Sequence, residues 1–172
     1  MRKSIPPENT MVYYSLLILL IIALPPLAFG APARDASAVF KNAEGIEWVL
    51  SEVRTAGITV RIDRQKLENE GMVNFFTITF VSEALSNEGR MSGTGAPNRY
   101  FGPYTVAANR ALNIGNVAST MMMASREPDG LKEHEYFNYL SKVKRWDLWE
   151  GKLELYSIDS AQSEVILVFV AN

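Results

Sequence analysis

Few side chains in this 172-residue chain could support catalysis or bind a metal ion. The sequence contains no cysteine, which excludes thiolate catalysis, disulfides, iron–sulfur clusters and cysteine-ligated zinc. Its one histidine, His134, lies in the charged run from Lys132 to Glu135, a pattern typical of the exposed face of a helix. We therefore interpret His134 as a solvated surface residue, and we expect no metal site and no cofactor.

Acidic side chains could still act as a pair. Asp147, Glu150 and Glu154 lie close together in the sequence, and two such carboxylates could serve as the acid and base of a glycosidase-like site. Scattered carboxylates are, however, usually exposed to solvent. A nucleophile–base site would need a serine or threonine beside His134 or a lysine, and no spacing indicates one. We predict that the protein is not an enzyme and has no catalytic residue.

Neither a phosphate-binding loop nor a nucleic-acid interface fits the sequence. Gly89, Gly93 and Gly95 form a glycine-rich stretch, but it lacks the Gly-Lys-Ser/Thr end and the strand–loop–helix context of a phosphate loop. We expect these glycines to form tight turns between strands. The formal net charge of −2 argues against nucleic acid as a partner, because affinity for many phosphates comes from clustered lysines and arginines.

The amino-terminal segment has the pattern of an export signal. Arg2 and Lys3 precede an apolar run from Val12 to Leu24, which is shorter than the about 20 residues that a membrane-spanning helix needs. We predict a signal peptide over residues 1–30, a linker over residues 31–44 and one domain over residues 45–172. The alternative is an uncleaved anchor that contacts the membrane. Both interpretations export the domain to the periplasm or the outer envelope.

Short alternating segments in the rest of the chain predict antiparallel strands. Apolar residues at every second position turn one face of each strand towards a core and leave the other face in water. The chain ends in a continuously apolar strand from Val165 to Val170. The alternating apolar positions are Ile58, Val60 and Ile62; Phe76, Ile78 and Phe80; and, in a hairpin that turns at Glu150 and Gly151, Trp146 and Leu148 with Leu153 and Leu155.

One segment has helical periodicity. Tyr136, Leu140 and Val143 fall on one face of a helix that we predict between residues 128 and 144. Asp129 could cap its start. One late helix in a sheet-rich chain predicts a mainly β fold of the α+β class, in which the helix packs against an antiparallel β-barrel or a strongly curved sheet.

The stretch from Gly89 to Ala124 carries the most distinctive motifs. They are Asn-Arg-Tyr at Asn98, Arg99 and Tyr100, Gly-x-Tyr at Gly102 and Tyr104, and Ala-Ser-Thr-x-Met from Ala118 to Met122. In this order the motifs resemble those of the META domain family, which includes bacterial heat-shock proteins of the HslJ type. The resemblance extends over roughly residues 46–170.

The resemblance implies a conical antiparallel β-barrel with one packed helix, and an association with envelope stress and secretion. It carries over no catalytic residue. We expect Asn98 to hydrogen-bond the backbone of its own tight turn. We interpret the family-signature residues as structural; they are Asn98, Arg99, Tyr100, Gly102, Tyr104, Ser119, Thr120 and Met122.

The same stretch contains the candidate surface for a ligand or partner: Arg99, Tyr100, Met121, Met122 and Met123. Arg99 and Tyr100 could form a cation–π or ligand-facing pair. Methionine-rich patches adapt to many partners. In a strand, however, Met121 and Met123 would face one side and Met122 the other, so we expect core filling with one exposed methionine.

We therefore predict an exported, non-catalytic envelope protein that binds an envelope protein or a lipid through a barrel rim or a sheet edge. The alternative is a carrier that holds an apolar ligand, such as an acyl chain, inside the barrel. Four aromatic side chains distinguish these two functions. If they fill the interior of the barrel, the carrier is excluded; if they line a void, the carrier is favoured. They are Phe76, Phe80, Phe137 and Trp146. A basic–aromatic cluster of Lys142, Lys144, Arg145 and Trp146 could contact lipid headgroups, but we expect it to end the helix in solvent.

Overall fold

A computed structural model describes residues 39–82, 88–123 and 128–172. All of them belong to one compact unit, Pro32–Asn172. The predicted signal peptide lies outside the described residues. Among the described helices, none is long and apolar enough to span a membrane.

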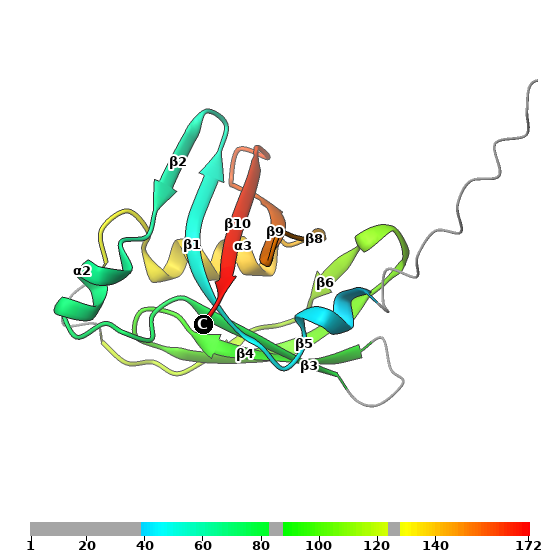
Figure 1. Cartoon of the computed structure of the whole chain (residues 1–172), viewed down its shortest axis with the longest axis horizontal. Coiled ribbons are helices and arrows are strands. Elements are labelled where there is room, and N and C mark those ends of the chain that lie inside the picture. The colour runs from blue at the N-terminus through cyan, green and yellow to red at the C-terminus, as the bar shows by residue number, and fades with distance from the viewer. Residues whose placement is uncertain (1–38, 83–87, 124–127) are drawn as a thin grey trace, which may run out of the picture. The chain divides into compact units, whose positions relative to one another are not determined.

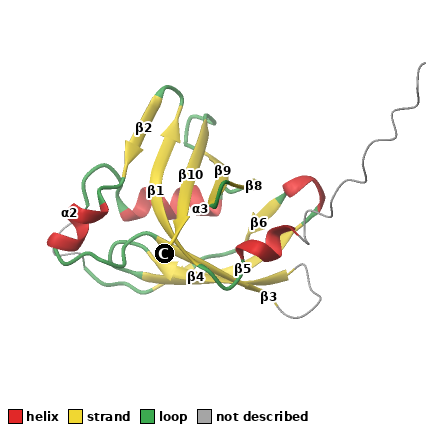
Figure 2. Ribbon diagram, viewed as in Figure 1, coloured by secondary structure: helices red, strands yellow, loops and turns green. Residues whose placement is uncertain are grey.

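The described chain is built mainly of strands, as Figures 1 and 2 show. Its helical elements are η1 (Lys41–Ala43), α2 (Arg64–Asn69), η2 (Ala108–Arg110) and α3 (Glu133–Ser141). Its strands are β1 (Glu47–Thr55), β2 (Ile58–Arg61), β3 (Thr77–Ser82), β4 (Glu88–Thr94), β5 (Arg99–Val106), β6 (Leu112–Ile114), β7 (Ala118–Ser119), β8 (Arg145–Trp149), β9 (Lys152–Ile158) and β10 (Glu164–Ala171).

The strands form one antiparallel sheet in the order β6-β5-β4-β3-β1-β10-β9-β8, with β2 paired to β1 and β7 paired to β5. The two ends of this sheet meet at a single bridge between Ala111 and Arg145, and the Leu112 N–H donates to the Lys144 carbonyl at 3.1 Å. The sheet is therefore a nearly closed barrel, which confirms the predicted fold class.

The sheet bends sharply between β3 and β1. β1 pairs with β3 only through Glu47, Val49 and the residue between them, and its second half pairs with β2 instead. In Figure 1, β3, β4 and β5 run across the lower part of the view, and β1 and β10 rise steeply from them. This change of direction makes room for α3 inside the curve of the sheet.

Glycines on the inner face of β4 make room for large rings on β5. Gly89 is opposite Tyr104 and Gly93 is opposite Tyr100. An added Cβ would lie 2.6 Å from the Tyr104 ring at Gly89 and 2.8 Å from the Tyr100 hydroxyl at Gly93. The prediction that these two glycines form tight turns is wrong, because they lie within a strand where only glycine leaves space for the tyrosine of the next strand.

The core follows the predicted alternation. Phe76, Ile78 and Phe80 are fully buried, as are Trp146, Leu153 and Leu155 of the β8–β9 hairpin. The predicted helical stripe of Tyr136, Leu140 and Val143 is also buried. Val60 and Leu148 are only partly buried. Ile58 has 64% of its surface exposed, because β2 pairs only with β1 and forms an edge strand.

The folded part begins earlier than the predicted linker boundary. Phe40 is fully buried, and its ring lies 5.1 Å from that of Phe80 and 4.8 Å from that of Trp146. Ala43 is buried as well. Phe40 and Ala43 therefore contribute to the core of the domain.

Two helical predictions need correction. α3 starts at Glu133, where the Lys132 N–H donates to the Glu135 carboxylate at 2.9 Å, while Asp129 forms an ion pair with Lys66. Asp129 therefore does not cap the helix, and α3 is shorter than predicted. The short helix α2 was not expected; its start is capped by Asp63, which accepts from the Lys66 N–H at 3.0 Å.

Candidate functional site

A buried asparagine holds the methionine segment, which we define as Met121–Met123. Asn98 has only 7% of its surface exposed. Its Oδ1 accepts from the Met122 N–H at 2.6 Å and from the Thr120 hydroxyl at 2.9 Å, and its Nδ2 donates to the Met122 carbonyl at 3.2 Å. Asn98 does not bond its own turn as expected. It fixes a segment that lies more than twenty residues further along the chain.

Glu133, the first residue of α3, binds the same asparagine and the backbone next to it. Its Oε1 accepts from the Ala96 and Asn98 N–H groups, the latter at 2.7 Å, and its Oε2 accepts from Asn98 Nδ2 at 2.6 Å. An added Cβ at Gly95 would lie 2.6 Å from Glu133 Oε1. One carboxylate and one amide thus join the β4–β5 connection, the methionine segment and the start of α3.

The methionine side chains themselves are exposed. Met121 and Met123 have 98% and 96% of their surface in solvent, and Met122 has 52%. The expected core filling is therefore wrong. β7 ends at Ser119, so the segment is no core strand, and the main-chain partners of Met122 are Asn98 side-chain atoms. The result is a backbone anchored at its middle residue with apolar side chains displayed on both sides of it.

Arg99 borders this segment, whereas Tyr100 does not reach the surface. The Arg99 N–H donates to the Thr120 hydroxyl at 3.1 Å, and its carbonyl accepts from the Thr120 N–H at 3.0 Å. The Arg99 side chain is exposed, while Tyr100 points inward and is fully buried. The predicted Arg99–Tyr100 pair does not form, because neighbouring strand residues face opposite sides of the sheet.

Tyr100 instead takes part in a buried hydroxyl network. Its hydroxyl donates to the Thr77 carbonyl at 2.7 Å and lies 2.9 Å from the Tyr136 hydroxyl. Burial raises the pKa of both tyrosines well above the ordinary value. This network ties α3 to β3 and β5, so it serves the fold.

The remaining signature residues also serve the sheet. The Tyr104 hydroxyl donates to Glu44 Oε1 at 2.9 Å, and burial raises the pKa of Tyr104. Gly102 is opposite Met91, and an added Cβ there would lie 3.0 Å from the Asn116 carbonyl oxygen. Ser119 pairs with Tyr100 in the β5–β7 ladder. Of the signature, therefore, only Arg99 and Met122 place large side chains at the surface.

Two of the candidate acids, Asp147 and Glu154, are opposite each other in the β8–β9 ladder, and each is paired with an arginine. Asp147 forms an ion pair with Arg110, and Glu154 accepts from Arg54 Nη1 at 3.0 Å. Glu150 is exposed at the hairpin turn. His134 is exposed as expected. Across the described ranges, no group of three or more histidine, aspartate or glutamate side chains is arranged to hold a metal ion.

Only the basic part of the predicted basic–aromatic cluster reaches the surface, because Lys144 and Arg145 are exposed. Trp146 is fully buried, and its Nε1 has no hydrogen-bond partner among the described residues. The Arg145 guanidinium lies 3.5 Å from the centre of the Tyr156 ring. The exposed tryptophan is Trp149, at the tip of the β8–β9 hairpin.

Aromatic rings fill the interior. Phe76, Phe80 and Trp146 have no exposed surface, and the Phe137 ring packs 5.4 Å from that of Tyr100. A carrier of an apolar ligand would need a void lined by these four side chains. In the described part of the chain they pack against protein, so the observation that would have favoured a carrier is missing.

An unpredicted residue fixes the position of α2. The Arg64 Nε donates to the Leu50 carbonyl at 3.0 Å, and its Nη1 donates to the Phe75 carbonyl at 2.6 Å. Burial lowers the pKa of Arg64 to about 10. Sequence reasoning missed this contact, because no pattern shows that an arginine will bond backbone carbonyls of β1 and of the segment before β3.

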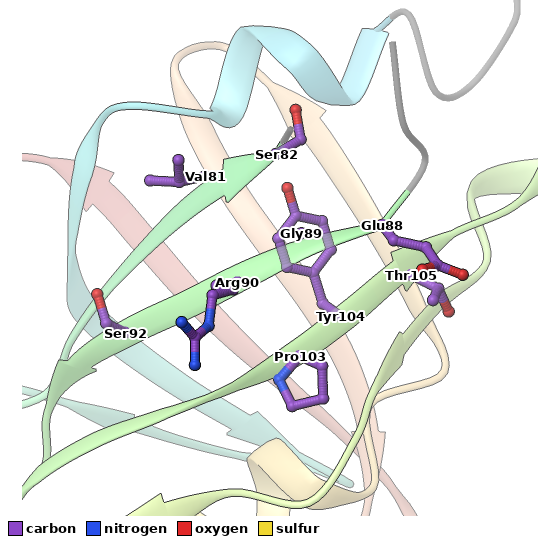
Figure 3. A pocket seen from close by; sticks show the side chains of 9 residues that line it. All are labelled: Val81, Ser82, Glu88, Gly89, Arg90, Ser92, Pro103, Tyr104 and Thr105. Carbon is purple, nitrogen blue, oxygen red and sulfur yellow. The ribbon is translucent and has the colours of Figure 1, made fainter. Parts of the chain in front are cut away.

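Several hollows lie on the described surface, and two of them are similar in size. The first, of about 490 Å³, lies over β3, β4 and β5, and Figure 3 shows Arg90 and Pro103 on it and the Tyr104 ring passing across Gly89. The second, of about 510 Å³, lies between α3 and the β6–β7 stretch. Neither was predicted, because each brings together residues from separate elements.

Comparison with known proteins agrees with this architecture. A protein from Burkholderia xenovorans solved by NMR superposes with a TM-score of 0.56 at 18% identity, covering 98% of this chain and 99% of that one. A DUF4847 family protein from Bacteroides vulgatus, a crystal structure, superposes with a TM-score of 0.52 at 16% identity, covering 78% and 97%. At these identities the likeness shows the fold alone. The search of curated proteins finds no match. Residues 41–171 match the META domain, and the chain therefore belongs to the META domain family.

Proposed function

We propose that this protein is an exported, non-catalytic interaction module of the cell envelope. Its contact surface is the methionine segment together with Arg99. The observation that carries the proposal is the near-complete exposure of Met121 and Met123 on a backbone that Asn98 holds in place.

The energetics of this arrangement favour a protein partner. Burying one methionine side chain contributes about 1.5–3 kcal/mol, so covering Met121 and Met123 would contribute about 3–6 kcal/mol to association. Two bonds from Asn98 to the Met122 backbone restrict the segment before any partner arrives. Such prior ordering lowers the entropy cost of binding. Flexible thioether side chains on a fixed backbone suit an apolar groove of a partner.

The absence of catalysis and the envelope location are part of this proposal. The candidate acids are engaged with arginines, as at Asp147 and Glu154. The positive residues and apolar run at the amino terminus support export, and the small residues around Gly30 and Ala33 suit signal peptidase. A role under envelope stress would fit the family to which the chain belongs.

Photo-crosslinking tests the contact surface. The full chain is produced in its bacterial host with p-benzoylphenylalanine in place of Met123, and in a second strain in place of Ile58, an exposed apolar residue on β2. We expect a defined crosslinked protein from position 123 and not from position 58. A matched Met121→Glu substitution in the position-123 strain should abolish the product, because it places a charge in the apolar contact.

Three outcomes would count against the proposal. Identical products from positions 58 and 123 would show nonspecific capture. A product confined to lipid would make the segment a membrane contact. Mass spectrometry of the mature chain gives the third, because an intact leader on protein confined to the cytoplasm would contradict export, whereas cleavage after Gly30 or Ala33 supports it.

A further inference from the structure

The second hollow lies where the barrel fails to close. The Leu112 N–H to Lys144 carbonyl bond and the Ala111–Arg145 bridge join β6 to the start of β8. Beyond this junction α3 borders β6 and β7. We call the hollow there the seam groove; it has a volume of about 510 Å³ and is lined by Asn113, Ile114, Gly115, Asn116, Val117, Ser119, Phe137, Asn138 and Ser141.

The rim of the seam groove is polar and uncharged. No lining residue carries a charge. Amides come from Asn113, Asn116 and Asn138, and hydroxyls come from Ser119 and Ser141. Within the described residues, the side-chain amides of these three asparagines have no hydrogen-bond partner. Each amide offers two N–H donors and a carbonyl acceptor, so the rim holds many unused groups of both kinds.

The floor of the seam groove is apolar and rigid. Ile114 is buried, and Val117 and Phe137 pack against the core. The Phe137 ring lies 5.4 Å from the Tyr100 ring and 5.9 Å from the Tyr136 ring, and these neighbours fix its orientation. An apolar floor below a ring of donors and acceptors is the usual plan of a small-molecule site.

We propose that the seam groove binds a neutral saccharide. A pyranose ring has a C–H face that suits the Phe137 and Ile114 floor, and hydroxyls around its edge that suit asparagine amides. The volume lies within the range of about 300–1,000 Å³ that small-molecule sites occupy. The groove has no charge to balance an anionic or cationic ligand.

An extended peptide suits the seam groove less well. Strand addition needs a run of free backbone groups along an edge. β6 has only three residues, Leu112–Ile114, and the Leu112 N–H already bonds Lys144. A saccharide needs no such run, because the asparagine and serine side chains supply its contacts. This inference is independent of the methionine segment and of its partner.

Saturation-transfer NMR and calorimetry on the full chain test the proposal. The probes are chitobiose, cellobiose and maltose, three uncharged disaccharides, with glucuronic acid and a neutral tripeptide for comparison. We expect saturable binding of at least one disaccharide. Asn138→Ala and Asn113→Ala should each weaken it about three- to tenfold, the effect of losing one or two hydrogen bonds to a neutral ligand.

Asn69→Ala on α2 is the matched control, because this exposed asparagine lies outside the seam groove; it should leave the affinity unchanged. Asn113 is exposed, so its variant should keep the wild-type melting temperature, and a loss of binding cannot then be ascribed to unfolding. The proposal is overturned if no disaccharide binds at millimolar concentration, if the groove variants bind as the wild type does, or if only the tripeptide or the acid depends on Asn113 and Asn138.

Discussion

Replacing Asn98 with alanine should both destabilise the fold and release the methionine segment. The side chain makes four hydrogen bonds, to the Met122 N–H, the Met122 carbonyl, the Thr120 hydroxyl and Glu133. A typical bond contributes about 0.5–1.5 kcal/mol, and one to a charged group about 1.5–3 kcal/mol. Because water can replace some partners of the exposed segment, we expect a loss of about 2–5 kcal/mol in the free energy of unfolding.

Two measurements separate these effects. Thermal unfolding should show a decrease in melting temperature of about 8–20 °C, at about 4 °C per kcal/mol for a domain of this size. Hydrogen exchange should show a loss of protection at the Met122 amide, because that N–H donates to Asn98 Oδ1 in the wild type. Thr120→Val removes only the hydroxyl contacts, so Met122 should stay protected.

The exchange result is decisive for the proposed anchoring. If the Met122 amide keeps its protection in Asn98→Ala, then Asn98 does not hold the segment, and the prior ordering on which the interaction surface depends is refuted. A large decrease in stability with unchanged exchange would mean that Asn98 acts through Glu133 alone. Asn42→Ala is the control, because Asn42 is exposed; it should change neither quantity.

Three further perturbations test the packing. Gly93→Ala should destabilise the domain by about 3 kcal/mol or more, since the new Cβ would lie 2.0 Å from the Thr77 carbonyl oxygen; chemical denaturation measures this, and a near-neutral result would contradict the close approach of β3 and β4. Tyr100→Phe should cost about 1–3 kcal/mol, because it removes the hydroxyl that bonds Thr77 and leaves Tyr136 with one partner fewer; an unchanged denaturation midpoint would argue against the network. Stability should also fall as the pH rises above about 10, the ordinary pKa of tyrosine, since the raised pKa of Tyr100 and Tyr136 means that only the unfolded chain loses these protons. Tyr104, whose pKa burial also raises, adds to this decrease, whereas the lowered pKa of Arg64 acts in the opposite direction. Because three groups oppose one, stability should fall with pH; phenolate absorbance that follows unfolding checks this, and ionisation of Tyr100 or Tyr136 in the folded state would contradict it.

Alternation and helical periodicity were enough to predict the sheet, the last hairpin and the buried face of α3. Ile78 and Phe80 obey a period of two because they lie on the core-facing side of β3, and Phe76, directly before β3, is buried as well. The patterns missed short elements and contacts made by polar side chains. α2 buries only Leu67, so it lacks an apolar stripe, and the Asp63 cap was its one local signal.

Only part of the candidate site could be predicted from the sequence. Arg99 and the methionines were identified as a surface, but alternation placed two of the three methionines in a core. Alternation describes a chain paired with another strand, and Met122 is paired with a side chain. Asn98 satisfies both main-chain groups of Met122, so the backbone of Met122 needs no neighbouring strand as a hydrogen-bond partner. The methionine side chains of the segment can therefore stay exposed. That pairing joins residues far apart in the chain, and periodicity cannot reveal it.

Both proposed contact regions follow from places where the barrel departs from a regular sheet. Regular pairing satisfies backbone groups and buries alternate side chains, which leaves little for a ligand to contact. The methionine segment escapes burial because Asn98 replaces a strand partner, and the seam groove is present because β6 and β8 meet at one bridge. The Glu133 end of α3 supports the first and the Phe137–Ser141 face lines the second. A variant that loosens α3, such as Tyr100→Phe, should therefore weaken both contacts together, whereas substitutions at Met121 or Asn113 should affect only one.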